Sequence, residues 1–322
     1  MEREKSFFFN NGMLQATAVL AMTLLVVALI PFIGPMTIIM TPLPILYYSF
    51  RLGGVQALAA LAVAFAAVLF IMSLIGRPLN PMTFIMIGFT GVMLAEVLKR
   101  RYTLEKTFTV ASLMLFFSSV GFILYYGAQA GVSPWRMVEL YIEGAIKENL
   151  ILYQQMNMSE DQIAVIRENT KEIARFFTDI FPALTLCGAI LTVWLNILAG
   201  RSLLRSHSGL FPDFGDLSLW KAPEKLVWLL IFSGAMLLLP EQALGTIGMN
   251  VLIVCCMIYL FQGLAITSFF FRHKQIPTAF KVIFYVLIAV QQYMLFFIIA
   301  VGLADIWIDF RRRIAGTKDA PV

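Results

Sequence analysis

Long uncharged stretches dominate the pattern of apolar and polar positions along the chain. Eight long segments contain no Asp, Glu, Lys or Arg: residues 6–50, 52–76, 78–95, 107–135, 180–200, 226–240, 242–271 and 282–304. A helix needs roughly 20 apolar residues to cross the hydrocarbon core of a bilayer. Most of these segments are long enough, and the first is long enough for two helices. The pattern therefore predicts an all-α fold, a polytopic transmembrane helical bundle.

We expect about nine membrane helices, near residues 13–32, 36–50, 54–75, 81–98, 108–128, 180–200, 225–244, 246–271 and 281–304. The second of these contains Pro42 and Pro44, and proline removes a backbone donor and interrupts the helix. We therefore predict a short or half-length second helix with an unwound entry at residues 41–44. The last helix is predicted to continue as one rod through Asp305 toward Arg311, because no breaker stands between them.

The distribution of basic residues predicts a cytoplasmic N-terminus. Lys and Arg concentrate on the cytoplasmic side of membrane proteins, and this orientation places most of the short basic loops inside. It also places Arg51, Lys99–Lys106 and Arg201 on one face of the membrane. Nine spans would leave the arginines at 311–313 outside, against this rule. Either the tail is an exception, or one of the segments 226–244 and 246–271 is re-entrant, which gives eight spans.

The chain divides by pattern into four parts. Residues 1–200 are predicted to form a six-helix membrane unit that includes an outer loop, residues 129–179. This loop holds eight carboxylates and five basic side chains. Ser133 and Ser159 stand where helix caps are expected, so the loop should contain amphipathic helices, lying on the membrane surface or folded over the bundle. A cytoplasmic loop at 201–225, C-terminal membrane helices at 226–310 and a basic tail at 311–322 complete the chain.

Composition excludes several classes of protein. Of the 322 residues, 60% are hydrophobic and only 13% are charged, which argues against a water-soluble enzyme. The formal charge of +5 comes from loops between spans, so no nucleic-acid partner is expected. The three cysteines lie in apolar runs and predict neither a disulfide framework nor a metal site. His207 and His273 stand beside basic residues in loops, and no catalytic or phosphate-binding motif is present. We predict no enzymatic activity, no metal and no cofactor.

The polar residues inside the spans are uncharged. Mid-span carboxylates usually mark the ion path of self-powered transporters, and the middle of each span lacks them here. Uncharged groups most often join helices by hydrogen bonds, and they are also suited to hold an uncharged molecule. The predicted ligand-binding residues are Thr37, Thr41, Gln56, Thr83 and Asn196.

Three phrases in the C-terminal third support a family resemblance. They are residues 216–224 (DLSLWKAPE), 262–265 (QGLA) and 302–311 (GLADIWIDFR). With the hydropathy layout, they resemble the YybS-like family of uncharacterised bacterial membrane proteins over nearly the whole chain. This resemblance implies a multi-pass protein of the bacterial cytoplasmic (inner) membrane.

A second, distant resemblance covers the first half. The short helix, Arg-Leu-Gly-Gly turn and small-residue helix of residues 44–74 are similar to part of the substrate-binding components of energy-coupling-factor vitamin transporters. Those components bind a small molecule and dock on a separate energising module. Their docking Ala-xxx-Ala pair has no counterpart in the first helix here.

Two functions compete. The first is binding, or helping to transport, a small and mostly uncharged solute or lipid-like molecule without an energy source of its own. Its partners would be the lipid bilayer and an energising or other membrane protein. The second is a non-transporting membrane scaffold that recruits partners through cytoplasmic loops. The second is favoured by the aromatic residues Phe211, Phe214 and Trp220 of the 201–225 loop.

Overall fold

The computed structural model describes residues 11–30, 38–77, 79–156, 159–204 and 211–315. Every regular element in these ranges is helical, which confirms the predicted all-α class. The chain divides into two compact units. Unit 1 comprises residues 1–118 and 188–214, and unit 2 comprises residues 119–187 and 215–322. The six-helix membrane unit expected for residues 1–200 stays a prediction.

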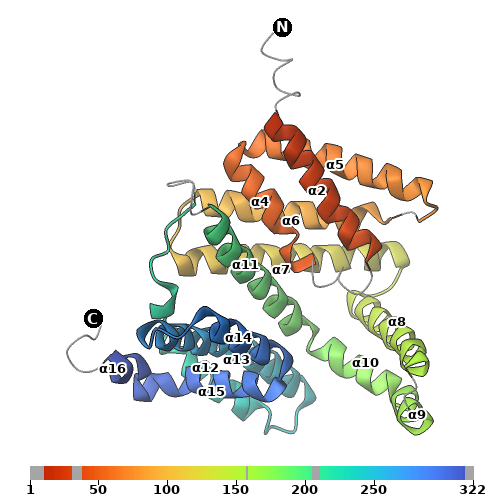
Figure 1. Ribbon diagram of the computed structural model, residues 1–322. Helices are drawn as coiled ribbons and strands as arrows, with labels where there is room; N and C mark the ends of the chain where they lie inside the picture. The colour runs from red at the N-terminus through yellow and green to blue at the C-terminus, as the bar shows by residue number, and fades with distance from the viewer. Residues whose placement is uncertain (1–10, 31–37, 78, 157–158, 205–210, 316–322) are drawn as a thin grey trace. The chain divides into compact units, whose positions relative to one another are not determined.

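Unit 1 is a helical bundle whose helices meet through small and aliphatic side chains. It contains α2 (Asn11–Leu29), α4 (Pro42–Arg51), α5 (Gly54–Leu74), α6 (Pro81–Lys99), the start of α7 (Leu104–Ala130) and the later part of α11 (Phe181–Leu204). Helix α5 buries Ala57, Ala60 and Ala64 completely, at helical spacing. Because alanine lets two backbones approach closely, α2 packs along this face (Figure 1).

The turn after α4 and the end of α6 lie together within unit 1. A Cβ atom placed on Gly54 would lie 3.3 Å from the Lys99 ammonium nitrogen. Glu96 binds that nitrogen at 2.6 Å. Arg51, three residues before Gly54, therefore lies at the same end of the bundle as Lys99, in agreement with the predicted placement of these two basic residues on one face.

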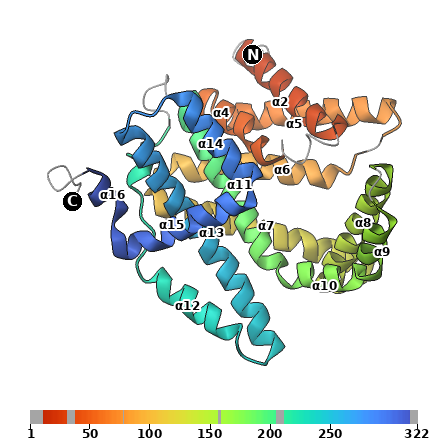
Figure 2. The same cartoon turned by 60° about the horizontal axis from the view of Figure 1, so that its bottom comes forward.

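Unit 2 contains the helices of the outer loop and of the C-terminal third. These are α8 (Pro134–Gln155), α9 (Glu160–Glu168), α10 (Thr170–Asp179), the 3-10 turn η1 (Leu217–Leu219), α12 (Leu226–Met236), α13 (Gln242–His273), α14 (Thr278–Val290), α15 (Gln292–Ile308) and α16 (Phe310–Ala315). Helix α13 packs against both α12 and α15. The long rod of α13 and the shorter α12 beside it are seen in Figure 2.

The predicted nine spans are not confirmed. Among the described residues, five helices are long and apolar enough to cross a membrane: α2, α5, α7, α11 and α13. The pair α14–α15 makes a sixth if it counts as one bent span. Helix α12 has 11 residues, so it measures about 16 Å, roughly half of a bilayer core. The alternative in which residues 226–244 do not cross is therefore the one that the helix lengths favour.

The prediction of one continuous last helix was wrong. Helices α14 and α15 are bent by 105° at Gln291, whose backbone is extended. A second break follows at Asp309, which has a left-handed conformation with φ 45°. Aspartate is one of the few residues that tolerate this conformation. The Asp305 carboxylate accepts a hydrogen bond from the Phe310 N–H at 2.8 Å, so a side chain replaces the helical acceptor beyond this break.

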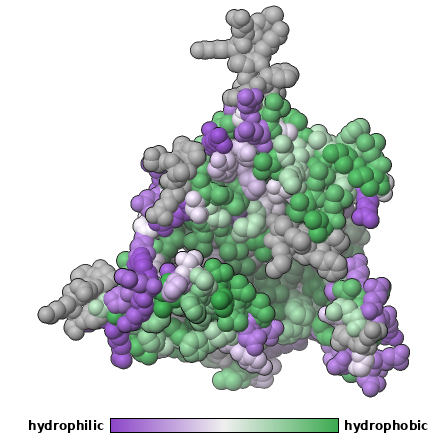
Figure 3. Space-filling model, viewed as in Figure 1, coloured by the Kyte–Doolittle hydropathy of each residue, from purple (hydrophilic) through white to green (hydrophobic). Residues whose placement is uncertain are grey.

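The outer loop is helical, as predicted. Ser133 accepts a hydrogen bond from the Arg136 N–H at the start of α8, and Ser159 accepts one from Gln162 at the start of α9. Hydrophilic residues gather over this α8–α10 hairpin in Figure 3, whereas most of the other helices present hydrophobic residues.

Candidate functional site

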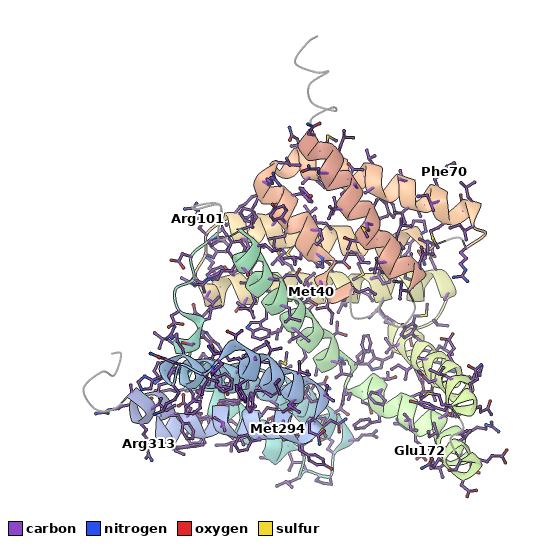
Figure 4. The ribbon with its side chains drawn as sticks, in the orientation of Figure 1. Met40, Phe70, Arg101, Glu172, Met294 and Arg313 are labelled. Atoms are coloured by element: carbon purple, nitrogen blue, oxygen red, sulfur yellow. The ribbon has the colours of Figure 1, made fainter. Side chains whose placement is uncertain are left out.

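The break before α4 is the first polar feature of interest. Residues 38–40 are helical, Thr41 is a turn residue, and α4 begins at Pro42. A proline at the start of a helix loses no hydrogen bond, because the first N–H groups have no partner within the helix. The prediction of an unwound entry at residues 41–44 was wrong: Thr41 has helical backbone angles, and both prolines lie within the first turn of α4. Thr41 is buried with 2% exposure. Met40, the last residue before this turn, is labelled in Figure 4.

Asn196 of α11 bonds to the backbone at this break. Its side-chain amide donates to the Ile39 carbonyl and to the Thr192 carbonyl, both at 2.7 Å. The packing is close, since a Cβ atom on Gly200 would lie 3.1 Å from Leu46 of α4. Helix α11 therefore packs directly against the proline-containing segment.

The oxygen of the same amide is an acceptor that no described group satisfies. Asn196 is fully buried, and its Oδ1 has no hydrogen-bond partner among the described residues. The Ser112 hydroxyl on α7 is in the same condition at 3% exposure. Ser112 follows Ala111 in the sequence, and Asn196 precedes Ile197. Ala111 and Ile197 belong to one apolar cluster, which is built from α4, α6, α7 and α11. A buried acceptor without a donor costs about 1–3 kcal/mol.

The structure brings together part of the predicted ligand-binding set. Asn196 binds the Ile39 carbonyl, two residues before Thr41 in the sequence, and both Asn196 and Thr41 are buried. Gln56 is half-buried on α5, and in the described structure no hydrogen bond joins it to Asn196. Thr37 and the side chain of Thr83 lie outside the described residues.

A second polar feature, in unit 2, joins the three phrases on which the family resemblance rests. Arg311 of α16 binds the Asp305 carboxylate at 2.8 Å and donates to the carbonyls of Ser218 and Trp220 at 3.0 and 2.7 Å. Gln262 of α13 donates to the same carboxylate at 3.1 Å. We call these five residues the Arg311 network.

The ion pair of the Arg311 network is buried. The side chains of Arg311 and Asp305 are 3% and 1% exposed. Burial lowers the pKa of Arg311, and the Asp305 and Asp309 carboxylates oppose that effect. Removing one partner of such a buried pair typically costs about 3–5 kcal/mol, because it leaves an uncompensated charge. This arrangement therefore fixes the loop around η1 against α13 and α16.

Helices α13 and α15, which carry Gln262 and Asp305 of the network, are in close backbone contact. A Cβ atom on Gly302 of α15 would lie 2.0 Å from the Tyr259 carbonyl oxygen. One on Gly263 of α13 would lie 2.1 Å from the Ile298 carbonyl oxygen. Because 259 faces 302 and 263 faces 298, the two helices run antiparallel, and only glycine fits where they touch.

The loop around η1 also contacts the end of α13. Arg272 forms an ion pair with Asp216, and Lys221 lies 3.4 Å from the Asp309 carboxylate. Burial alone would raise the pKa of Asp216, but hydrogen bonds from Arg272 and Ser218 outweigh it and lower that pKa. Arg272 and Arg311 thus both bind the short loop around η1. The nine-span topology had placed these two residues on opposite faces of the membrane.

Sequence reasoning missed this network. It assigned Arg311 to a basic tail and expected one continuous helix through Asp305. The usable signal was the composition of the three phrases, each of which contributes a polar residue to one cluster: Ser218, Gln262, and the Asp305–Arg311 pair.

Comparisons with known proteins agree with the membrane character of the fold. The family model described as "Predicted membrane protein (DUF2232)" matches residues 17–306. The chain is also similar to "Uncharacterized protein YybS" of Bacillus subtilis (strain 168), with 22% identity over 306 residues, 91% of this chain and 94% of that protein. No solved structure matches, so the resemblance to vitamin-transporter components stays an expectation.

Proposed function

Since the chain belongs to the DUF2232 family of membrane proteins, we propose that it binds a small, mostly uncharged solute or lipid-like molecule within unit 1. The observation that carries this proposal is the Asn196 amide. Its nitrogen is bound to the backbone at the break before α4, which fixes the direction of its oxygen. That oxygen is buried and lacks a donor among the described residues, so a ligand N–H or O–H would satisfy it.

The polarity of the surroundings supports an uncharged ligand. The buried polar side chains described in unit 1 are Thr41, Ser49, Thr107, Ser112 and Asn196, none of which is ionisable in the physiological range. A charged ligand buried there would have no compensating charge and would be strongly disfavoured. An uncharged ligand with hydrogen-bond donors meets no such penalty.

The packing of the 201–225 loop favours binding over the scaffold hypothesis. Phe211 and Phe214 pack against the cluster formed by α4, α6, α7 and α11. Arg311 holds the backbone of Trp220. The aromatic residues that suggested a recruiting surface therefore contribute to intramolecular packing. An energising partner protein, a bacterial inner-membrane location and a cytoplasmic N-terminus belong to this proposal.

Ligand-induced thermal stabilisation tests the proposal. The purified full-length protein would be melted with a panel of nucleobases, uncharged vitamins and neutral lipids. We expect at least one compound to raise the melting temperature of the wild type, and Asn196→Leu to abolish that rise.

The matched control is Asn250→Leu in unit 2. The Asn250 amide is fully bonded, accepting from the Ala183 N–H and donating to the carbonyls of Asp179 and Thr246. This variant loses stability but keeps the ligand response. A panel without any effect on the wild type, or a full response in Asn196→Leu, would contradict the proposal.

A further inference from the structure

The α8–α10 hairpin contains a groove that the proposed function does not use. One wall is a single face of α8, formed by Glu143, Lys147, Leu150, Ile151 and Gln154. The other wall is the junction of α9 and α10, formed by Arg167, Glu168, Thr170 and Lys171. The spacing of three, four and seven residues along α8 places its members on one side of the helix.

The hairpin has a core of its own, which fixes the two walls. Leu150 of α8, Ile163 of α9 and Ala174 of α10 are buried, and α8 packs along α10. The junction is tight, because the Thr170 hydroxyl donates to the Ile166 carbonyl at 2.9 Å. Glu172, labelled in Figure 4, follows directly after the groove residue Lys171.

The charges in the groove do not cancel. Lys147, Arg167 and Lys171 are exposed, and none of them forms an ion pair within the described part of the chain. Of the two carboxylates, Glu143 lies 3.3 Å from Arg136, which stands outside the groove and binds Glu139 more closely, at 2.7 Å. Three cations and two carboxylates therefore line the groove, a net charge of +1, within a hairpin whose other charges are mostly acidic. The three cations stand together on the two walls of the groove, where they can face one anion.

We propose that this groove binds a phosphate-bearing anion, either the headgroup of an anionic phospholipid or a free phosphate compound. Arginine presents a planar fork that matches two phosphate oxygens, and lysine adds a compact charge. Buried Leu150 and exposed Ile151 give the α8 wall an apolar side next to the cations. This combination suits the junction between a charged headgroup and its glycerol and acyl parts.

Two probes distinguish the sources. Inorganic phosphate is titrated into the detergent-solubilised full-length protein by calorimetry. Separately, native mass spectrometry counts phosphatidylglycerol retained by protein taken from nanodiscs that contain phosphatidylglycerol and phosphatidylcholine. The test variant combines Lys147→Gln, Arg167→Gln and Lys171→Gln. The control variant combines Arg77→Gln, Lys225→Gln and Lys274→Gln, which removes the same charge outside the groove.

We expect the groove variant to lose at least about tenfold in affinity or retention for one probe, since each cation near an anionic surface contributes about fivefold. The control variant keeps wild-type binding. Loss for phosphatidylglycerol alone identifies a headgroup site, and loss for inorganic phosphate identifies a site for free phosphate compounds.

The single variant Glu168→Gln gives a test of opposite sign. Removing the groove carboxylate that lies between Arg167 and Lys171 in sequence should strengthen binding several-fold, a gain that a damaged hairpin would not produce. The proposal is overturned if groove and control variants behave alike with both probes, or if Glu168→Gln fails to strengthen either interaction.

Discussion

Replacing Arg311 with leucine is expected to destabilise unit 2 by about 3–5 kcal/mol. The guanidinium serves three acceptors, the Asp305 carboxylate and the carbonyls of Ser218 and Trp220. Because the Arg311 and Asp305 side chains are 3% and 1% exposed, water does not replace the lost donors. Exposed ion pairs contribute only about 0–1 kcal/mol to the free energy of unfolding, and this small contribution does not apply to a buried pair.

Unfolding in mixed micelles with a rising fraction of dodecyl sulfate, followed by circular dichroism, measures this loss. Arg312→Leu is the matched control, because Arg312 is the next residue and its side chain is exposed. This substitution should change the free energy of unfolding by less than about 0.5 kcal/mol. The double variant Arg311→Leu with Asp305→Leu should recover much of the loss, since no buried charge remains. Equal stability of Arg311→Leu and Arg312→Leu would refute the reasoning.

Three further predictions concern packing, pH and sidedness. Gly302→Ala should destabilise the protein by more than about 3 kcal/mol in the same assay, because its Cβ would lie 2.0 Å from the backbone of α13, whereas Gly234→Ala meets nothing within 4 Å and should be neutral or stabilising. The pKa of Asp216 is lowered in the folded protein, so its carboxylate contributes stability above the unfolded pKa, and this stability is lost as the pH falls through the folded pKa. The melting temperature measured down to pH 3 should therefore fall less in Asp216→Asn than in the wild type. Cysteines introduced at Arg51 and Arg101 should react with an impermeant label from the same side of the membrane; labelling from opposite sides would contradict the fold of unit 1.

The helices could be predicted from sequence because their causes are local. Apolar runs of sufficient length, the serine caps at 133 and 159, and the prolines at 42 and 44 act within a few residues of themselves. The candidate site in unit 1 was partly predictable for the same reason. An uncharged polar residue in a span needs a partner, and Asn196 has found one at the neighbouring break.

The Arg311 network was not predictable because its partners are distant in sequence. Arg311 stands in a run of three arginines, and hydropathy treats all three alike. Only the left-handed turn at Asp309 carries Arg311 back toward Asp305 and the loop around η1, 91 and 93 residues earlier. The break at Gln291 has no proline or glycine to announce it, so the pattern favoured one rod.

Helix α13 has 32 residues and thus measures about 48 Å, against roughly 30 Å for the hydrocarbon core. Lying wholly in that core would demand a tilt near 50°, beyond the usual range of about 0–40°. The excess of at least one turn must enter the headgroup layer. At its C-terminal end, Arg272 is tied to Asp216, so this end is fixed to the loop around η1. The tilt of α13 then depends on bilayer thickness. A thicker membrane decreases the tilt angle and a thinner one increases it, and the loop around η1 moves with the end of the helix.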